Sequence, residues 1–176
     1  MIYFIRHGQS EANVRRVFAG QKDDSPLTEE GRNQARLTAQ ALKDKNTIID
    51  KIVHSSLKRA EETALIIATE LGYNIEDLEI DNRITEYDMG DLTSTPAREV
   101  TSRQLIVAPN AENVDDFHNR IHDFVEEIKH SNENILVVSH AGVGRMLEIM
   151  KTKGDKTLFY DLPSYPNASI NELDWL

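Results

Sequence analysis

Short apolar runs alternate along this chain with longer stretches in which apolar residues recur every three or four positions. The short runs have the length of buried strands, and the longer stretches have the period of amphipathic helices. This alternation predicts an α/β sheet with helices on both faces, and the run at 135–138 is apolar throughout, as in a strand covered on both sides. The expected strands are 3–5, 48–54, 78–80, 135–138 and 168–173.

Capping residues mark the ends of the expected helices. Thr28 precedes two glutamates and Asn113 precedes an apolar stripe, so both are expected N-caps. Ser55 or Ser56 is the expected cap of another helix, which Gly72 ends. The helices are expected to run from 29 to about 45, from 57 to 71, from 114 to about 130, and from 142 to 151. The apolar positions expected to pack in the first helix are Ala35, Leu37, Ala39 and Leu42.

Composition and charge narrow the class of protein. The 176 residues can form one sizeable core, and no repeat or linker divides them, so a single domain over 1–176 is expected. The 20 basic and 30 acidic residues give a net charge of −10, which does not attract nucleic acid or an anionic membrane. Cysteine is absent, which excludes disulfides and thiolate chemistry. Residues 1–7 lack the features of a signal peptide, and a cytoplasmic location is expected. An acidic protein that handles an anionic substrate needs a local cluster of cations.

Such cations and other reactive side chains follow the predicted strands. Residues 6–13 follow the first strand, 55–59 the second and 139–142 the strong apolar strand, while 83–86 lie between them. Ligands of α/β folds bind at the carboxyl ends of strands. The segments that follow the strands should therefore meet at one edge of the sheet, bringing together two histidines, at least two arginines and a carboxylate.

These are the groups that phosphoryl transfer through a histidine requires. A neutral imidazole such as His7 is a competent nucleophile, and a hydrogen bond to its other nitrogen can fix the tautomer. Guanidinium groups match the phosphoryl oxygens and stay charged. A carboxylic acid such as Glu86 can protonate the leaving oxygen. Gly8, directly after the histidine, is expected to let the backbone approach the phosphate closely.

Taken together, these segments resemble the histidine phosphatase superfamily, in its phosphoglycerate mutase-like branch. The resemblance extends over nearly the whole chain and keeps the family's order of motifs. The matching residues are Arg6-His7-Gly8-Gln9-Ser10-Glu11 with Asn13; Leu27-Thr28 with Gly31 and Gln34-Ala35; Ser55, Leu57, Arg59-Ala60 and Thr63-Ala64; Glu86 with Gly90; Pro109 to Asn113; Ser139-His140-Ala141-Gly142; and Asn167-Ala168-Ser169-Ile170.

The resemblance implies a role for each matching residue. His7 would be the phosphohistidine nucleophile, and Glu86 would donate the proton to the leaving group. The fold would be a three-layer sandwich with a mixed, mostly parallel sheet. No metal and no cofactor would be needed, and the partner would be a small phosphorylated substrate. The expected catalytic residues are His7, Glu86, Arg6, Arg59 and His140, and the expected substrate-binding residues are Arg6, Asn13, Arg59, His140, Gln21 and Ala141.

Two departures from the family pattern bear on the reaction. The run after the expected acid reads Gly90-Asp91-Leu92-Thr93-Ser94-Thr95-Pro96 and lacks the usual Glu-Gly ending, and residues 109–113 lack two glycines. The stretch between Glu86 and the 114–130 helix is also shorter than in the mutases of this family. The shortening favours a phosphatase that hydrolyses phosphomonoesters. A phosphoglycerate mutase-like phosphotransferase and a non-catalytic phospholigand-binding domain stay open as alternatives.

Several further side chains have two interpretations. Arg15, Arg16 and Lys22 follow residues 6–13, here called the histidine loop. They either meet a second anionic group of the substrate or lie in solvent. Arg145 either faces the pocket or pairs with Glu148 one turn away. Leu92 and residues 94–108 are expected to form a partial lid. His118 and His122 have the spacing of a helical metal pair, but no third ligand is marked, and a solvated face is the preferred interpretation. The substrate's identity and the oligomeric state cannot be read from the sequence.

Overall fold

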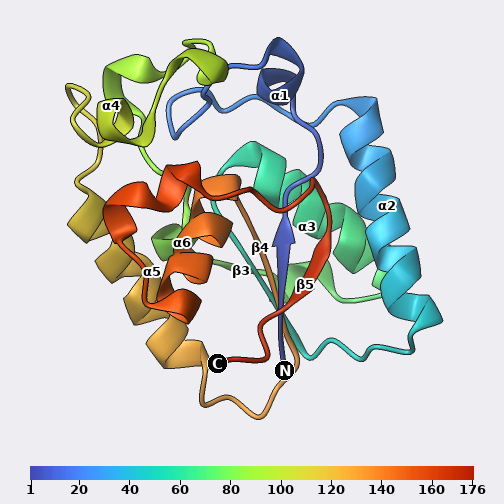
Figure 1. Cartoon of the computed structure of the whole chain (residues 1–176). Coiled ribbons are helices and arrows are strands. Elements are labelled where there is room, and N and C mark those ends of the chain that lie inside the picture. Colours follow the sequence, from blue (N-terminus) through green and yellow to red (C-terminus); the bar gives the residue numbers. More distant parts are fainter.

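A computed structural model describes residues 1–98 and 100–176 in full and the backbone alone at position 99. Within the described residues, five strands form one sheet in the order β3-β2-β4-β1-β5 (Figure 1). Neighbouring strands are parallel except β5, which runs antiparallel to β1. The strands are β1 (Ile2–Arg6), β2 (Lys51–His54), β3 (Glu79–Ile80), β4 (Ile135–Ser139) and β5 (Ile170–Glu172). The predicted α/β fold with a mixed, mostly parallel sheet is confirmed.

Strand β4 lies at the centre of the sheet, as its apolar sequence predicts. All five of its residues are buried. It pairs with β1 in a register that sets Arg6 beside Ser139, and with β2 in a register that sets His54 beside Val138. The ends of three parallel strands therefore lie level with one another, and the segments that follow them leave the sheet at the same edge.

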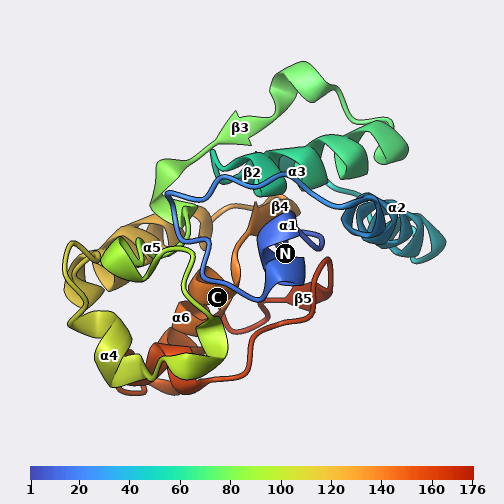
Figure 2. The same ribbon diagram turned by 90° about the horizontal axis from the view of Figure 1, so that it is seen from above.

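Helices cover both faces of the sheet, and each face has its own apolar cluster. Helices α2 (Glu29–Asp44) and α3 (Lys58–Leu71) lie over one face, where their small alanines pack on Ile5, Ile52 and Val138. Helices α5 (Val114–Ile128) and α6 (Ala141–Thr152) lie over the other, where their larger side chains meet Phe4 and Val137 (Figure 2). Burying an apolar face of each helix against the sheet is the main stabilising contribution of this arrangement.

The capping predictions are confirmed at three positions and wrong at one. Thr28 and Asn113 accept backbone hydrogen bonds as N-caps, and Gly72 ends α3 with a positive φ of 71°. Helix α3 instead begins after Leu57 without a side-chain cap. The hydroxyl of Ser55 accepts from the Leu57 amide but lies closer to a histidine, as described below.

Leu37 does not pack as predicted, since 61% of it is exposed. Ala35, Ala39 and Leu42 are buried as expected and are separated by four and three positions, so they lie on the face of α2 that meets the sheet. Leu37 is two positions from both alanines and therefore points away from that face.

Short helices replace much of the irregular structure expected after the strands. Helices α1 (Glu11–Arg15) and α4 (Ser102–Ile106) lie above the carboxyl ends of the strands (Figure 1). The 3₁₀ turns are η1 (Ile75–Asp77), η2 (Asn82–Ile84), η3 (Gly90–Leu92), η4 (Ala97–Glu99) and η5 (Lys156–Asp161). Among the described residues, no helix combines the length and apolar composition needed to cross a bilayer.

Candidate active site

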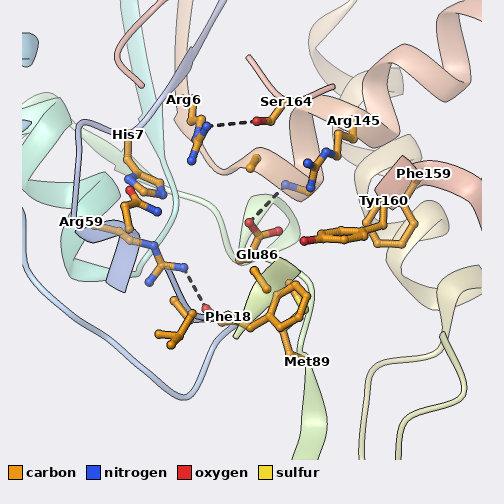
Figure 3. Close-up of a pocket in the computed structure, with 17 residues that line it drawn as sticks. Arg6, His7, Phe18, Arg59, Glu86, Met89, Arg145, Phe159, Tyr160 and Ser164 are labelled. Atoms are coloured by element: carbon orange, nitrogen blue, oxygen red, sulfur yellow. Dashed lines mark hydrogen bonds between the residues drawn. The ribbon is translucent and has the colours of Figure 1, made fainter. Parts of the chain in front are cut away.

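The strand ends bring the two predicted histidines together. His7 follows β1 and His140 follows β4, and their ring centroids lie 5.3 Å apart. The amide of His7 donates to the carbonyl of Ser139 at 2.8 Å, which continues the sheet pairing one residue beyond each strand. Both imidazoles are buried. The prediction that these segments meet at one edge therefore holds in the structure (Figure 3).

One ring nitrogen of His7 is engaged by the backbone. Its Nδ1 lies 2.7 Å from the carbonyl oxygen of Gly8, which can only accept a hydrogen bond. The proton of the neutral ring is therefore on Nδ1, and Nε2 keeps its lone pair. Burial lowers the pKa of His7 well below its ordinary value, and the charges of Arg59 and Arg6 lower it further. The ring is thus neutral at physiological pH, and Nε2 is its unprotonated nitrogen.

The close approach that glycine permits at position 8 is to the backbone of the protein itself. A Cβ at this position would lie 2.4 Å from the carbonyl oxygen of Gly31, at the start of α2. The Gly8 amide donates to the hydroxyl of Thr63 on α3 at 3.0 Å. Glycine is needed here because the histidine loop is clamped between α2 and α3. The tight contact therefore fixes the direction of His7, whereas the sequence suggested closeness to a phosphate.

Two arginines are held beside His7 by backbone carbonyls. Arg59 is almost completely buried and donates to the carbonyls of Gly20 at 2.8 Å and Asp23 at 3.3 Å. Arg6 donates to the carbonyl of Tyr165 at 2.8 Å. Burial lowers the pKa of both guanidinium groups, and the negative charge of Glu86 opposes that shift. Among the described residues, no carboxylate forms an ion pair with either arginine, so both can bind an anion.

Two polar atoms in this site are buried and have no partner among the residues that the structure describes, namely Nε of Arg6 and Nδ1 of His140. A buried polar group without a hydrogen bond costs about 1–3 kcal/mol. Burial lowers the pKa of His140 well below its ordinary value, and the positive charge of Arg59 contributes. The site therefore holds a cationic donor and a neutral imidazole whose hydrogen-bonding capacity an oxyanion would satisfy.

Glu86 lies across the pocket from these groups, on the segment that follows η2. Its carboxylate accepts hydrogen bonds from the amides of Tyr87 at 2.8 Å and Gly142 at 3.2 Å. Its own backbone carbonyl accepts from Gln21 at 2.8 Å and from Arg120 at 3.1 Å. These contacts fix both the peptide and the carboxylate. Glu86 is therefore a rigidly placed acid at the N-terminus of α6.

A cavity of about 160 Å³ lies between Glu86 and the arginines. Asn13 lines it, and its amide oxygen accepts hydrogen bonds from Ser10 and Asn167, so its amide nitrogen is the end that can donate to a ligand. The expected site residues that line the cavity are Arg6, His7, Asn13, Arg59, Glu86 and Ala141. His140 does not line the cavity, and its ring lies against that of His7. Gln21 donates a hydrogen bond to the backbone carbonyl of Glu86 but does not line the cavity either.

The cations of the histidine loop do not line the cavity. Arg15 pairs with Asp23 at 2.7 Å, and Lys22 pairs with Asp88 at 3.6 Å. Arg16 is exposed at the end of α1. The solvated interpretation is therefore correct for these three residues. Arg145 does line the cavity, and Glu148 instead accepts a hydrogen bond from the Tyr165 hydroxyl.

Sequence reasoning missed the apolar part of the cavity wall. Phe18, Met89, Phe159 and Tyr160 line it together with Ser164. Aromatic and methionine side chains in loops give no chemical signal, so their position depends on the fold. Of the predicted partial lid, Leu92 packs against the core, and among the described residues of 94–108 only Ala97 lines the cavity.

The histidine pair on α5 lies away from this cavity. The rings of His118 and His122 stack with centroids 6.0 Å apart, and His122 is exposed. Its nearest acidic partners, Asp123 and Glu126, are 3.9 and 3.8 Å away. Within the described part of the chain, no cluster of three or more potential ligands could hold a metal ion.

The small cavity thus lies beside two arginines and a neutral imidazole, opposite a fixed carboxylate. The family model of the histidine phosphatase superfamily (branch 1) matches residues 2–176. The chain therefore belongs to the histidine phosphatase superfamily, as its motifs suggested. Both phosphatases and phosphoglycerate mutases are found among its relatives.

Three comparisons describe the neighbourhood of the chain. The 2,3-bisphosphoglycerate-dependent phosphoglycerate mutase of Parvibaculum lavamentivorans is 39% identical over 93 residues, which are 53% of this chain and 44% of the mutase. The uncharacterized phosphatase PhoE of Bacillus subtilis is 32% identical over 160 residues, 89% of this chain and 80% of the phosphatase. A mycobacterial glucosyl-3-phosphoglycerate phosphatase solved with VO3 has a TM-score of 0.78 at 26% identity, covering 96% of this chain and 88% of that protein.

Proposed function

We propose that this chain is a phosphomonoester hydrolase that works through a phosphohistidine on His7. The observation that carries the proposal is the 2.7 Å contact between Nδ1 of His7 and the Gly8 carbonyl. It leaves Nε2 unprotonated beside the guanidinium groups of the half-buried Arg6 and the buried Arg59. An unprotonated nucleophile among fixed cations is the arrangement that phosphoryl capture requires.

In the first step, Nε2 of His7 attacks phosphorus and the bond from phosphorus to the ester oxygen breaks. The ester oxygen keeps the electron pair of that bond and takes the proton of Glu86, so the alcohol leaves neutral. Arg6, Arg59 and Asn13 stabilise the charge on the three equatorial oxygens. This step needs Glu86 in its acid form and leaves it as a carboxylate.

In the second step, a water molecule attacks the phosphorus of the phosphohistidine. Glu86, now a carboxylate, takes a proton from the water, and the bond between phosphorus and Nε2 breaks. Inorganic phosphate leaves, and both His7 and Glu86 return to their starting protonation states. The same residue thus serves as acid and then as base, as microscopic reversibility requires.

Transfer to water is the outcome that the length of the chain after Glu86 favours. The chain is short between Glu86 and α5, where the mutases of this family carry an insertion. Coverage of the relatives does not separate the two reactions, because the Bacillus phosphatase matches over 89% of this chain and a probable phosphoglycerate mutase of Yersinia pestis over 85%. A mutase would have to keep its phosphohistidine until phosphate returned to the substrate, so the lifetime of the phosphoenzyme separates the two reactions.

The substrate that fits best is a small phosphorylated molecule. The cavity of about 160 Å³ is smaller than the roughly 300–1,000 Å³ of pockets that hold drug-sized ligands. Two arginines and the N-terminus of α6 supply positive charge for the phosphoryl group. We therefore propose that turnover requires neither a metal ion nor an organic cofactor.

The test is the hydrolysis of 4-nitrophenyl phosphate by the purified chain in the presence of EDTA. Turnover should persist in EDTA and should be inhibited by vanadate, which mimics the transferred phosphoryl group. His7→Ala should lose about 10³-fold or more, by analogy with other catalytic nucleophiles. His122→Ala, an exposed histidine on α5, is the matched control and should retain full activity. Turnover by His7→Ala at the control rate would overturn the proposal.

A non-catalytic phospholigand-binding domain is the remaining alternative. It would bind vanadate or phosphate but would hydrolyse no phosphomonoester. The fixed position of Glu86 argues against it, because a site that only binds phosphate has no use for a carboxylate facing the anion.

A further inference from the structure

The cavity has two chemically different sides (Figure 3). Arg6, His7 and Arg59 form the side that receives the phosphoryl group. Arg145 and Tyr160 form the opposite side, and Glu86 lies between the two. Because Glu86 is the proposed proton donor to the leaving oxygen, the rest of the leaving alcohol must extend toward the side of Arg145.

Arg145 is held in place on that side. It projects from the second turn of α6, and its Nε donates to the carbonyl of Leu162 at 2.8 Å. Its guanidinium carbon lies 4.5 Å from the ring centroid of Tyr160, in a cation–π contact. Among the described residues, no carboxylate forms an ion pair with it. Arg145 is thus a preorganised cation in a cavity with no protein anion as its partner.

Apolar side chains line the cavity beside this half-buried cation. The rings of Phe18 and Tyr160 lie 5.4 Å apart, and Met89 and Ala97 line the cavity beside them. Figure 3 shows Phe18 and Met89 below Glu86, next to the aromatic side. A charge–charge contact is stronger in such partly desolvated surroundings than at an open surface.

We propose that Arg145, Tyr160 and Phe18 form a subsite for the leaving alcohol, which selects a short alcohol that carries a carboxylate. The planar guanidinium matches a carboxylate in shape and charge, and the apolar wall suits the short carbon chain between the carboxylate and the ester oxygen. The small cavity leaves no room for a long leaving group. This inference rests on the proposed function, because it assigns the leaving side from Glu86.

The test compares two esters that differ in the carboxylate alone, 2-phosphoglycolate and ethyl phosphate. The wild-type chain should show a higher kcat/KM for 2-phosphoglycolate. Arg145→Gln should lower the ratio of the two kcat/KM values about 30-fold, the lower end of the range for a hydrogen-bonded charge pair that loses one partner, because Arg145 is half-buried. Lys151→Gln removes one positive charge from the exposed side of the same helix and should keep the wild-type ratio.

Arg145→Lys guards against a variant that fails to fold. It keeps the charge and loses the planar fork, so it should lower the ratio by about tenfold. Ratios in both arginine variants equal to that of the wild type would overturn the subsite while leaving the proposed hydrolase intact.

If the wild type hydrolyses neither these two esters nor 4-nitrophenyl phosphate, the proposed function fails and calorimetry still decides the subsite. Binding of 2-phosphoglycolate should then be tighter than binding of ethyl phosphate, and Arg145→Gln should remove the difference. Equal affinities of the wild type for the two esters would overturn the subsite.

Discussion

The hydroxyl of Ser55 lies 2.7 Å from Nε2 of His140. The same hydroxyl oxygen accepts from the Leu57 amide at 3.3 Å, which leaves its own proton available for the imidazole. Because burial keeps His140 neutral, a hydrogen bond received at Nε2 leaves the ring proton on Nδ1. That is the atom without a protein partner. We therefore expect Ser55 to donate to Nε2 of His140 and to hold the ring proton on Nδ1.

Without this hydroxyl, His140 should no longer be held in one tautomer. Ser55→Ala should lower kcat by about tenfold to 100-fold, corresponding to the roughly 1–3 kcal/mol cost of an unsatisfied buried group. Nitrogen NMR shifts of His140 should change from a single tautomer to a mixture. Ser56→Ala, the exposed neighbour, is the control for both readouts. A wild-type kcat together with an unchanged tautomer in Ser55→Ala would contradict the assignment.

Replacing the proposed acid should produce a loss that depends on the leaving group. Glu86→Gln should lower kcat/KM for an alkyl phosphate by about 10²–10⁴, the range of general acid catalysis. The loss should be smaller for 4-nitrophenyl phosphate, because nitrophenolate leaves with little need of a proton. Glu76→Gln, an exposed acid in η1, should behave as wild type. Equal losses for the two esters would remove Glu86 from the role of acid.

A methyl group added at Gly142 should displace the side chain of Glu86 without changing its charge. A Cβ at Gly142 would lie 2.2 Å from the carboxylate oxygen Oε1 of Glu86, so Gly142→Ala must push that carboxylate away. A misplacement of this size costs about 10²-fold in rate. At Gly154 the nearest atoms lie 3.3 Å away, and Gly154→Ala should have little effect on kcat. Steady-state rates of the two variants test this directly, and full activity of Gly142→Ala would argue against the fixed acid.

Some features of the fold and of the site could be predicted from the sequence, and others could not. The apolar run of β4 and the capping residues Thr28 and Asn113 act locally. The succession of strands and main helices along the chain could therefore be anticipated. The convergence of His7 and His140 followed from the rule that ligands bind at strand ends. The capping box of Thr101 and Gln104 was a local signal for α4 that the sequence already contained.

Other features could not be predicted because they depend on tertiary contacts. Arg120 holds the Glu86 carbonyl from α5, which is far away in the sequence. The closeness of Gly8 to Gly31 appears only when α2 docks against the histidine loop. The aromatic wall has the same origin, since Phe18 and Tyr160 meet only in the folded chain.

The two buried histidines should make stability depend on pH. Burial lowers the pKa of His7 and His140 well below 6.5, whereas the unfolded chain binds a proton at each near pH 6.5. Below about pH 6.5 the unfolded state therefore binds more protons, and the free energy of unfolding falls as the pH falls. Each histidine should contribute up to about 1.4 kcal/mol per pH unit there.

Urea unfolding between about pH 7.5 and pH 5 measures this dependence. His140→Asn should flatten the slope by the contribution of one histidine, whereas His122→Ala should leave it unchanged, because His122 is exposed. A free energy of unfolding that stays constant over this range would mean that neither buried imidazole resists protonation.

The most direct test of the account is the capture of the phosphoenzyme. Rapid quenching at high pH, after mixing with a phosphomonoester, should trap one phosphoryl group per chain, and mass spectrometry should assign it to His7. The modification should be stable to alkali and labile to acid, as a phosphoramidate bond is, and its decay in water should match the rate of phosphate release. A phosphoryl group on another residue, or turnover with no labelled intermediate in any quench, would contradict the central claim.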